Sequence, residues 1–195
     1  MWSDLRLSRL ARIYEWTHHI NRMLCVGMLL TKAMKGHIAL LGPAHAVSDE
    51  LPGIPSFDTP DFSQTLSEEK NMVSKLKKVF LMVAGAVVQK YGPQLEEHQQ
   101  MLLAASDILI EIYMAESAVL RAEKSTKNSS ENANYQVAMA QLYLYNAVDT
   151  ITSNAKIDLI SFAEGYHTRL MLSGAKRFTT TPTMPESVGR ANTIT

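Results

Sequence analysis

The residues best suited to chemistry lie close together near the start of the chain. Glu15 is followed by Thr17, His18 and His19. A carboxylate that is shielded from water becomes a stronger base, and Glu15 and His19 have the spacing to share a metal ion on one helical face. The sequence places no third or fourth metal ligand, so it predicts no metal site. By spacing alone, Glu15 is most simply interpreted as a surface residue before a helix.

The surrounding stretch adds information that the spacing of single residues does not give. Residues 13–22, IYEWTHHINR, resemble the I-[YF]-E-G-T-x-[EQ]-I-x-R segment near the C-terminal end of acyl-CoA dehydrogenases. The resemblance implies that Glu15 is the catalytic base and that Thr17 contacts the flavin. Trp16 replaces a glycine that lies beside the acyl thioester, so we expect its indole to crowd the substrate. His19 replaces the acid or amide that helps to hold the flavin, and its imidazole can hydrogen-bond with a different reach.

Further stretches resemble a long-tailed branch of this family, in which an extra helical domain follows the catalytic helical bundle. The resemblance implies FAD as the cofactor, an acyl-CoA substrate that loses a proton and a hydride, an electron-transfer partner and a homo-oligomer. Because the regions that precede the motif in such an enzyme are missing, we interpret the sequence as a C-terminal piece that does not oxidise acyl-CoA by itself. The matching stretches are residues 21–24, 27–30, 32–36, 78–86, 113–118, 143–149 and 161–165.

Four parts are expected along the chain. Residues 1–36 form the end of the catalytic helical domain, 37–64 a linker, 65–180 the appended helical bundle and 181–195 a flexible tail. The linker carries four of the prolines, which cannot sit inside one regular helix, although a helical turn across 44–51 is compatible with them.

The periodicity of apolar residues is helical throughout and predicts an all-α fold. Three to four long helices with short polar connections predict an antiparallel bundle, preceded by a separate N-terminal helix. Thr17 is expected to cap the first helix, and a capping box of Thr65 and Glu68 to begin the second. Gly36 and Gly92 are expected to end these two helices. The helices are expected over 17–35, 65–91, 94–124, about 130–162 with a break near Asn154, and 168–178.

Each predicted helix has an apolar stripe. The stripe of the first helix is expected to be exposed in this piece, because the partners that it is meant for are absent. Cys25 lies in an apolar run and is expected to be a small buried hydrophobe. The stripes are Ile20, Leu24 and Met28, flanked by Met23, Val26 and Leu30; Met72, Leu76, Val79, Phe80, Val83 and Val87; Leu102, Ala105, Leu109, Ile112, Ala115 (or Glu116) and Val119; and Val137, Ala140, Leu144, Val148 and Ile151.

Composition excludes several classes of function. The 19 basic and 19 acidic residues balance, so the chain has no basic footprint for nucleic acid and no polybasic membrane patch. The single cysteine rules out an internal disulfide framework. Charged or polar residues interrupt every apolar run before the roughly 20 residues of a membrane span, and no secretory signal is visible, so we expect a cytoplasmic protein.

Two other classes of function compete with the enzyme interpretation. The first is a non-catalytic helical oligomerisation or interaction module derived from the same family, which Trp16 favours. The second is a metal-carrying bundle using Glu111 and Glu116. This second class lacks the Glu-x-x-His pairs that such a site needs, so packing is the simpler interpretation of those two carboxylates.

Overall fold

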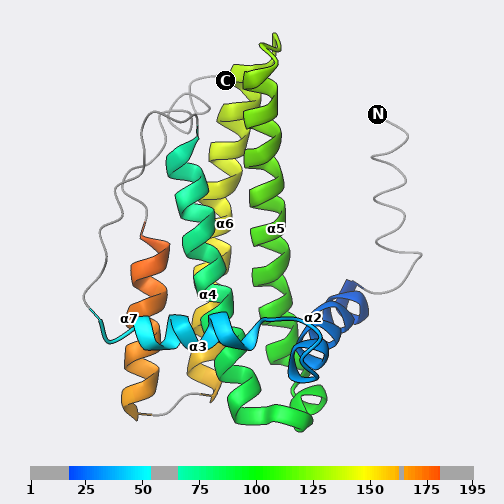
Figure 1. Ribbon diagram of the computed structural model, residues 1–195, viewed down its shortest axis with the longest axis vertical. Helices are drawn as coiled ribbons and strands as arrows, with labels where there is room; N and C mark the ends of the chain where they lie inside the picture. Colours follow the sequence, from blue (N-terminus) through cyan, green and yellow to red (C-terminus); the bar gives the residue numbers. More distant parts are fainter. Residues whose placement is uncertain (1–17, 54–65, 163–164, 181–195) are drawn as a thin grey trace.

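The computed structural model describes residues 18–53, 66–162 and 165–180 of the chain (Figure 1). Every regular element within these ranges is helical, which confirms the predicted all-α fold. None of the described helices is long and apolar enough to cross a membrane. The elements are α2 (His18–Met34), α3 (Leu41–Glu50), α4 (Ser67–Tyr91), the 3-10 helix η1 (Gly92–Glu97), α5 (Gln99–Lys127), α6 (Ala133–Phe162) and α7 (Gly165–Thr179).

The long helices α4, α5 and α6 lie side by side and run in alternating directions (Figure 1). The pair α5 and α6 makes the most extensive contact in the described part of the chain. α7 packs against α4 and α6, while α3 crosses α4 and α2 packs against α5. The antiparallel order follows from the short connections, because a five-residue loop between α5 and α6 can only return the chain beside the helix that it leaves.

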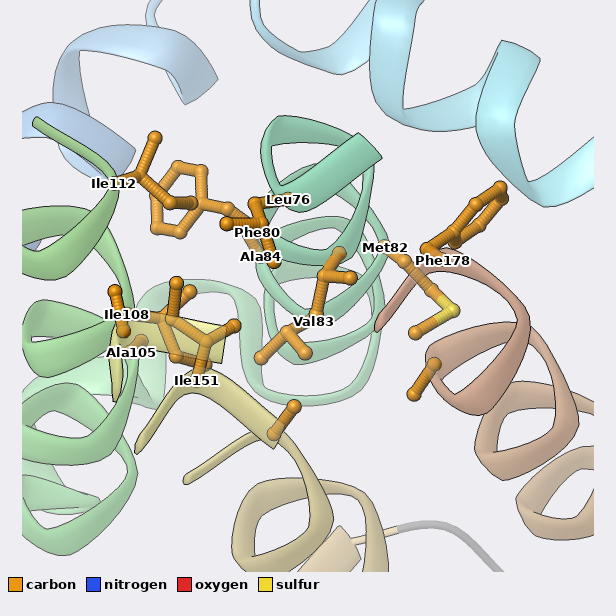
Figure 2. Close-up of a cluster of buried hydrophobic side chains, with 14 of the residues drawn as sticks. Leu76, Phe80, Met82, Val83, Ala84, Ala105, Ile108, Ile112, Ile151 and Phe178 are labelled. Atoms are coloured by element: carbon orange, nitrogen blue, oxygen red, sulfur yellow. The ribbon is translucent and has the colours of Figure 1, made fainter. Parts of the chain in front are cut away.

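The core is built around α4. All six residues of its predicted stripe are buried, which confirms the periodicity. Figure 2 shows that Phe80 and Val83 of α4 lie among Ile108 of α5 and Ile151 of α6, while Met82 lies toward Phe178 of α7. Fully burying a side chain of this size stabilises a fold by about 1.5–3 kcal/mol. The predicted stripes of α5 and α6 also face the core, with Ala115 buried and Glu116 turned outward.

The two ends of α4 are formed by different kinds of residue. Gly92 ends the helix at φ 45°, a conformation that favours glycine, as predicted. At the other end the N-cap is Leu66, at φ 60°, with no side-chain cap, so the predicted capping box of Thr65 and Glu68 does not begin this helix. Thr65 itself lies outside the described residues. Leu66 is buried in the core, and this burial opposes the strain of its left-handed backbone.

Several predicted boundaries were wrong. α5 begins at Gln99 rather than 94, because η1 occupies the residues after Pro93. α6 is continuous, without the predicted break at Asn154, because Ile151 before it and Ala155 after it are fully buried in the core. α7 starts at Gly165, three residues before Thr168. α3 is longer than the predicted turn and accepts Pro43 within its first turn, where a missing N–H is harmless.

Asp158 is the most unusual residue of the core. It is a carboxylic acid on α6, 1% exposed, and its Oδ2 atom has no hydrogen-bond partner. Burial away from water disfavours the charged form and raises the pKa of Asp158 to about 8. The folded protein therefore holds a proton at neutral pH that the unfolded chain releases near pH 4.

We predict that Asp158 makes the fold less stable as pH rises. With a raised folded pKa, its contribution is fully present below about pH 4 and is lost progressively up to about pH 8, on the order of 4 kcal/mol by pH 7. Asp158→Asn should reduce the fall in the free energy of unfolding between pH 5 and pH 8, measured by urea denaturation. Asp149→Asn, on the exposed side of the same helix, should leave that fall unchanged. An equal fall in wild type and Asp158→Asn would contradict the prediction.

Gly174 of α7 packs against Leu51, which follows α3, and against Met82 of α4. A Cβ added there would lie 2.2 Å from Cδ2 of Leu51 and 3.4 Å from Sδ of Met82. Because the first distance is shorter than real contacts allow, Leu51 would have to move. Glycine therefore permits this helix packing.

Gly174→Ala should destabilise the protein by about 1 kcal/mol net, because moving Leu51 costs about 1–3 kcal/mol and the helix preference of alanine offsets about 0.5–1 kcal/mol of it. Gly27→Ala on α2 is the matched control, since nothing lies within 4 Å of a Cβ built there. That control should stabilise α2 by about 0.5–1 kcal/mol. Thermal and urea denaturation of both variants measure the difference, and equal effects would refute the close approach of α7 to Leu51.

Candidate functional site

The residues expected to perform chemistry precede α2. Glu15, Trp16 and Thr17 lie outside the described residues, and so does the side chain of His19, whose backbone is in the first turn of α2. α2 is described from His18 onward, so the predicted N-cap at Thr17 lies outside the described residues and stays a prediction. The structure therefore fixes the helix to which the candidate site is attached and leaves the roles of these four residues as predictions.

Arg22, the arginine of the motif, attaches α2 to α5. Its Nη2 atom forms an ion pair with the carboxylate of Asp107 and lies 3.5 Å from the carbonyl oxygen of Leu103. The hydroxyl of Ser106 donates a hydrogen bond of 2.8 Å to the carbonyl oxygen of Arg22. The motif therefore continues into a helix that the C-terminal bundle holds by specific polar contacts. Composition and periodicity alone gave no signal for this attachment.

The apolar stripe predicted for α2 is exposed along its centre, as expected for a helix without its partners, and buried at its flanking residues. Leu24 is 53% and Met28 54% exposed, and Ile20 is also exposed, whereas Val26 and Leu30 are fully buried. Cys25, expected to be buried, is exposed too. The burial predicted for Cys25 was wrong because α2 is apolar on two sides, and apolar periodicity does not tell which side meets α5. The polar contacts of Arg22 select the Val26 side.

An apolar groove follows the outer face of α2. It has a volume of about 630 Å³ and includes Leu102 of α5 in its wall. Ile20, Leu24 and Met28 line it along α2, and Lys32, Lys35 and His37 line it where α2 ends. A partner that fits this groove would be apolar along most of its length and acidic at one end.

Glu111 and Glu116, the two glutamates considered for a metal site, connect helices of the bundle. Glu111 accepts a hydrogen bond of 2.8 Å from the Tyr143 hydroxyl, and burial, followed by this bond, raises the pKa of Tyr143 to about 12. Glu116 pairs with Lys77 at 2.6 Å. These contacts agree with the packing interpretation of the two glutamates, and no group of three metal-binding side chains occurs in the part of the chain that the structure describes.

Glu123 is a similar case at the far end of α5. Its carboxylate pairs with Lys127 at 2.7 Å and with Lys70 of α4 at 2.8 Å. Hydrogen bonds from Lys127 and then from Lys70 lower the pKa of Glu123 to about 2. A carboxylate held in its charged form by two lysines acts as a connection between α4 and α5 rather than as a base.

The orientation of α2 can be tested by truncating one leucine on each side of it. Leu30→Ala removes a fully buried side chain and should lower the free energy of unfolding by about 2–5 kcal/mol. Leu24→Ala, the matched control on the exposed side, should change it by less than about 0.5 kcal/mol. Urea denaturation of the two variants gives the comparison. A larger effect at Leu24 would mean that the predicted stripe, and not the Val26 side, faces the bundle.

Comparison with known proteins identifies the family. The model of the acyl-CoA dehydrogenase C-terminal domain matches residues 75–177. A probable acyl-CoA dehydrogenase of Bacillus subtilis (strain 168) is 36% identical over 175 residues, which is 89% of this chain and 29% of that protein. The crystal structure of an acyl-CoA dehydrogenase complexed with FAD from Bacillus anthracis matches with a TM-score of 0.85 and 36% identity, over 96% of this chain and 32% of that one.

Both matches cover so much of the chain that they take in α2 as well as the bundle. The chain spans only about a third of the length of either relative. The similarity thus lies in sequence and in fold together, over a region that contains the family's C-terminal domain. The chain belongs to the acyl-CoA dehydrogenase family.

Proposed function

We propose that the chain is the C-terminal part of an FAD-dependent acyl-CoA dehydrogenase, which introduces an α,β double bond into acyl-CoA thioesters. One observation carries this proposal: the helix that directly follows Glu15 and Thr17 is included in the region similar to an FAD-complexed member of the family. The proposal extends to a role in fatty acid β-oxidation in the cytoplasm, as a homo-oligomer that passes electrons to an electron-transfer partner.

In the proposed reaction, Glu15 is the base. Its carboxylate takes the α-proton, which the neighbouring thioester carbonyl acidifies. The electron pair of the broken Cα–H bond becomes the second bond between Cα and Cβ, and a hydride leaves Cβ. When bound, FAD supplies the acceptor for that hydride.

The donor groups near the start of α2 fit a flavin in their chemistry. Thr17 offers a hydroxyl and His19 an imidazole, and both can hydrogen-bond to the polar edge of a flavin. The start of α2 adds backbone N–H groups that favour an anionic group nearby. Trp16 fits less well, because it fills space where the family has glycine beside the substrate.

We propose that the groove of α2 packs against the preceding part of the catalytic helical domain. Residues 1–36 would be the end of that domain, 37–64 the linker and 65–180 the appended bundle. The exposed apolar side chains of Ile20, Leu24 and Met28 support this, because exposed apolar patches of such continuity mark interaction surfaces. Since relatives are about three times as long, an acyl-CoA dehydrogenase body is the partner that matches the groove.

The isolated chain is proposed to be inactive, because most of the surfaces that enclose flavin and substrate in a full enzyme would come from elsewhere. The alternative is a non-catalytic helical oligomerisation or interaction module derived from the family. Trp16 is the residue that favours this alternative.

Titration of the purified chain with FAD, followed by an acyl-CoA, tests the proposal. We expect a folded helical protein with no saturable change in flavin absorbance or tryptophan fluorescence. Co-expression with the B. subtilis relative truncated before its matching C-terminal region should give a yellow complex that acyl-CoA bleaches.

The outcomes separate the two functions. Saturable FAD binding and bleaching by the chain alone would refute its inactivity in isolation. If the co-expressed complex forms but holds no flavin, and Trp16→Gly does not restore it, the catalytic proposal is wrong and the interaction module stands. Leu24→Glu should prevent the complex from forming, while Tyr135→Glu, at an exposed site on α6, should not.

A further inference from the structure

α3 is a short helix that crosses the outside of the bundle over α4 (Figure 1). It has ten residues and no side-chain cap at its N-terminal end. Helices shorter than about 12–15 residues are marginal in water by themselves, so α3 depends on its contacts with the bundle. Those apolar contacts are few, because only Ala44 and Val47 of the helix are buried, together with Leu51 directly after it.

The packing beneath α3 is incomplete. A pocket of about 170 Å³ lies between α3, α4 and α7, with Ser48, Gly85 and Met171 in its wall. The closest approach to α4 is at Gly85, where an added Cβ would lie 3.0 Å from the Cβ of Ala44. Well-packed interiors leave few voids larger than a water molecule. Apolar packing therefore sets how close α3 comes to α4, but it holds the helix only weakly.

Polar contacts hold the C-terminal end of α3. The carboxylate of Glu50 accepts hydrogen bonds of 2.8 and 3.0 Å from Nζ of Lys78 on α4, and it lies 3.5 Å from Nη2 of Arg177 on α7. Arg177 also donates at 3.4 Å to the carbonyl oxygens of Glu50 and Gly53. The end of a helix leaves such carbonyl groups without partners and has a partial negative charge, so a guanidinium is favoured there.

A buried aromatic ring lies beside both cations. The guanidinium carbon of Arg177 is 4.8 Å from the ring centroid of Phe178, and Nζ of Lys78 is 5.6 Å from the same centroid. Both distances are within the range of a cation–π interaction. Phe178 is itself part of the core, so the two cations that reach Glu50 rest on a fixed surface. Three helices, α3, α4 and α7, thus meet at one charged cluster.

We propose that α3 is a strap that opens from the bundle as a unit while α4, α5 and α6 stay folded, and that Glu50, Lys78 and Arg177 form the latch that keeps it closed. Opening would uncover the apolar surface of α4 and α7 beneath the strap. Since α3 connects α2 to α4 along the chain, an open strap would leave α2 attached to the bundle mainly through α5. The proposal concerns this chain alone and does not rest on the proposed function.

The latch is accessible enough to respond to salt. The side chains of Glu50, Lys78 and Arg177 are 33%, 35% and 23% exposed, so dissolved ions partly screen their charges. The competing explanation is that the cluster is one more connection between helices and that α3 unfolds only with the whole bundle. Lys77 and Glu116, which pair at 2.6 Å between α4 and α5, provide a matched control for the loss of one ion pair.

Amide hydrogen exchange of the full chain, resolved by peptide, distinguishes the two explanations. The exchange of residues 44–51 reports on the strap, and that of residues 144–151 in α6 reports on the bundle. The variants are Arg177→Met, which keeps the aliphatic stem, Arg177→Lys, which keeps the charge, and Glu50→Gln. The control is Lys77→Met.

In the original chain, residues 44–51 should exchange faster than residues 144–151, because local opening costs less free energy than global unfolding. Arg177→Met should speed exchange of the strap about tenfold and leave α6 unchanged, since it removes charge-assisted contacts to α3 only. Arg177→Lys should have a smaller effect, because an ammonium retains the charge without the fork of donors. Lys77→Met should leave the strap unchanged.

A salt series adds a second readout that loss of packing would not move. Sodium chloride at about 1 M, where the Debye length is about 3 Å, should speed exchange of the strap in the original chain. Glu50→Gln should remove this dependence, because it takes away the carboxylate that both cations meet.

Three results would overturn the proposal. Exchange of residues 44–51 at the rate of α6 in the original chain would mean that α3 opens only with the whole bundle. An unchanged strap in both Arg177→Met and Glu50→Gln would mean that the cluster is no latch. An equal response to Lys77→Met would assign the effect to general loosening. FAD and acyl-CoA take no part in this measurement, so a failure of the proposed function would leave its result intact.

Discussion

The burial of α4 is the constraint on which the rest of the structure depends. This helix contacts α3, η1, α5, α6 and α7, and its buried residues extend well beyond one stripe. A helix that is apolar around most of its circumference is stable in water only when neighbours cover it on several sides. The other elements therefore arrange themselves around α4, and the close approach of α7 at Gly174 is part of that cover.

α2 is attached to the bundle in a different way from the helices around α4. One side of it is buried against α5 through Val26 and Leu30, and polar contacts at Arg22 set its orientation. Its other side is also apolar and remains open as a groove. A helix with two apolar sides fits between two partners, and the C-terminal bundle supplies one of them. The family's greater length is consistent with a second partner of the kind that we propose.

Polar groups in the bundle fall into two physical classes. Glu111, Glu116 and Glu123 reach partners on other helices, so their charges strengthen the packing. Asp158 has no partner and lies deep in the core, where only its protonated form is favourable. A pH-dependent weakness is thus built into a core whose other buried polar side chains in the described residues, Ser106, Ser125 and Thr179, carry no charge.

The sequence by itself determined the elements and the family. Strong 3.6-residue periodicity marked the long helices and the buried stripe of α4, and Gly92 marked the end of that helix, because these signals are local. The motif around Glu15 indicated the family, since it combines several residue types in a fixed order. All of these features can be read without knowing which segments meet in space.

Only the tertiary structure decided how the elements face one another. It turned Leu24 and Cys25 outward, because the choice between two apolar sides of α2 depends on Asp107 and Ser106, which lie more than eighty residues away. It also placed the start of α4 at Ser67, after the buried N-cap Leu66, and kept α6 continuous through Asn154. Local propensities differ by about 1 kcal/mol or less, so a buried side chain or a single long-range contact is enough to override them.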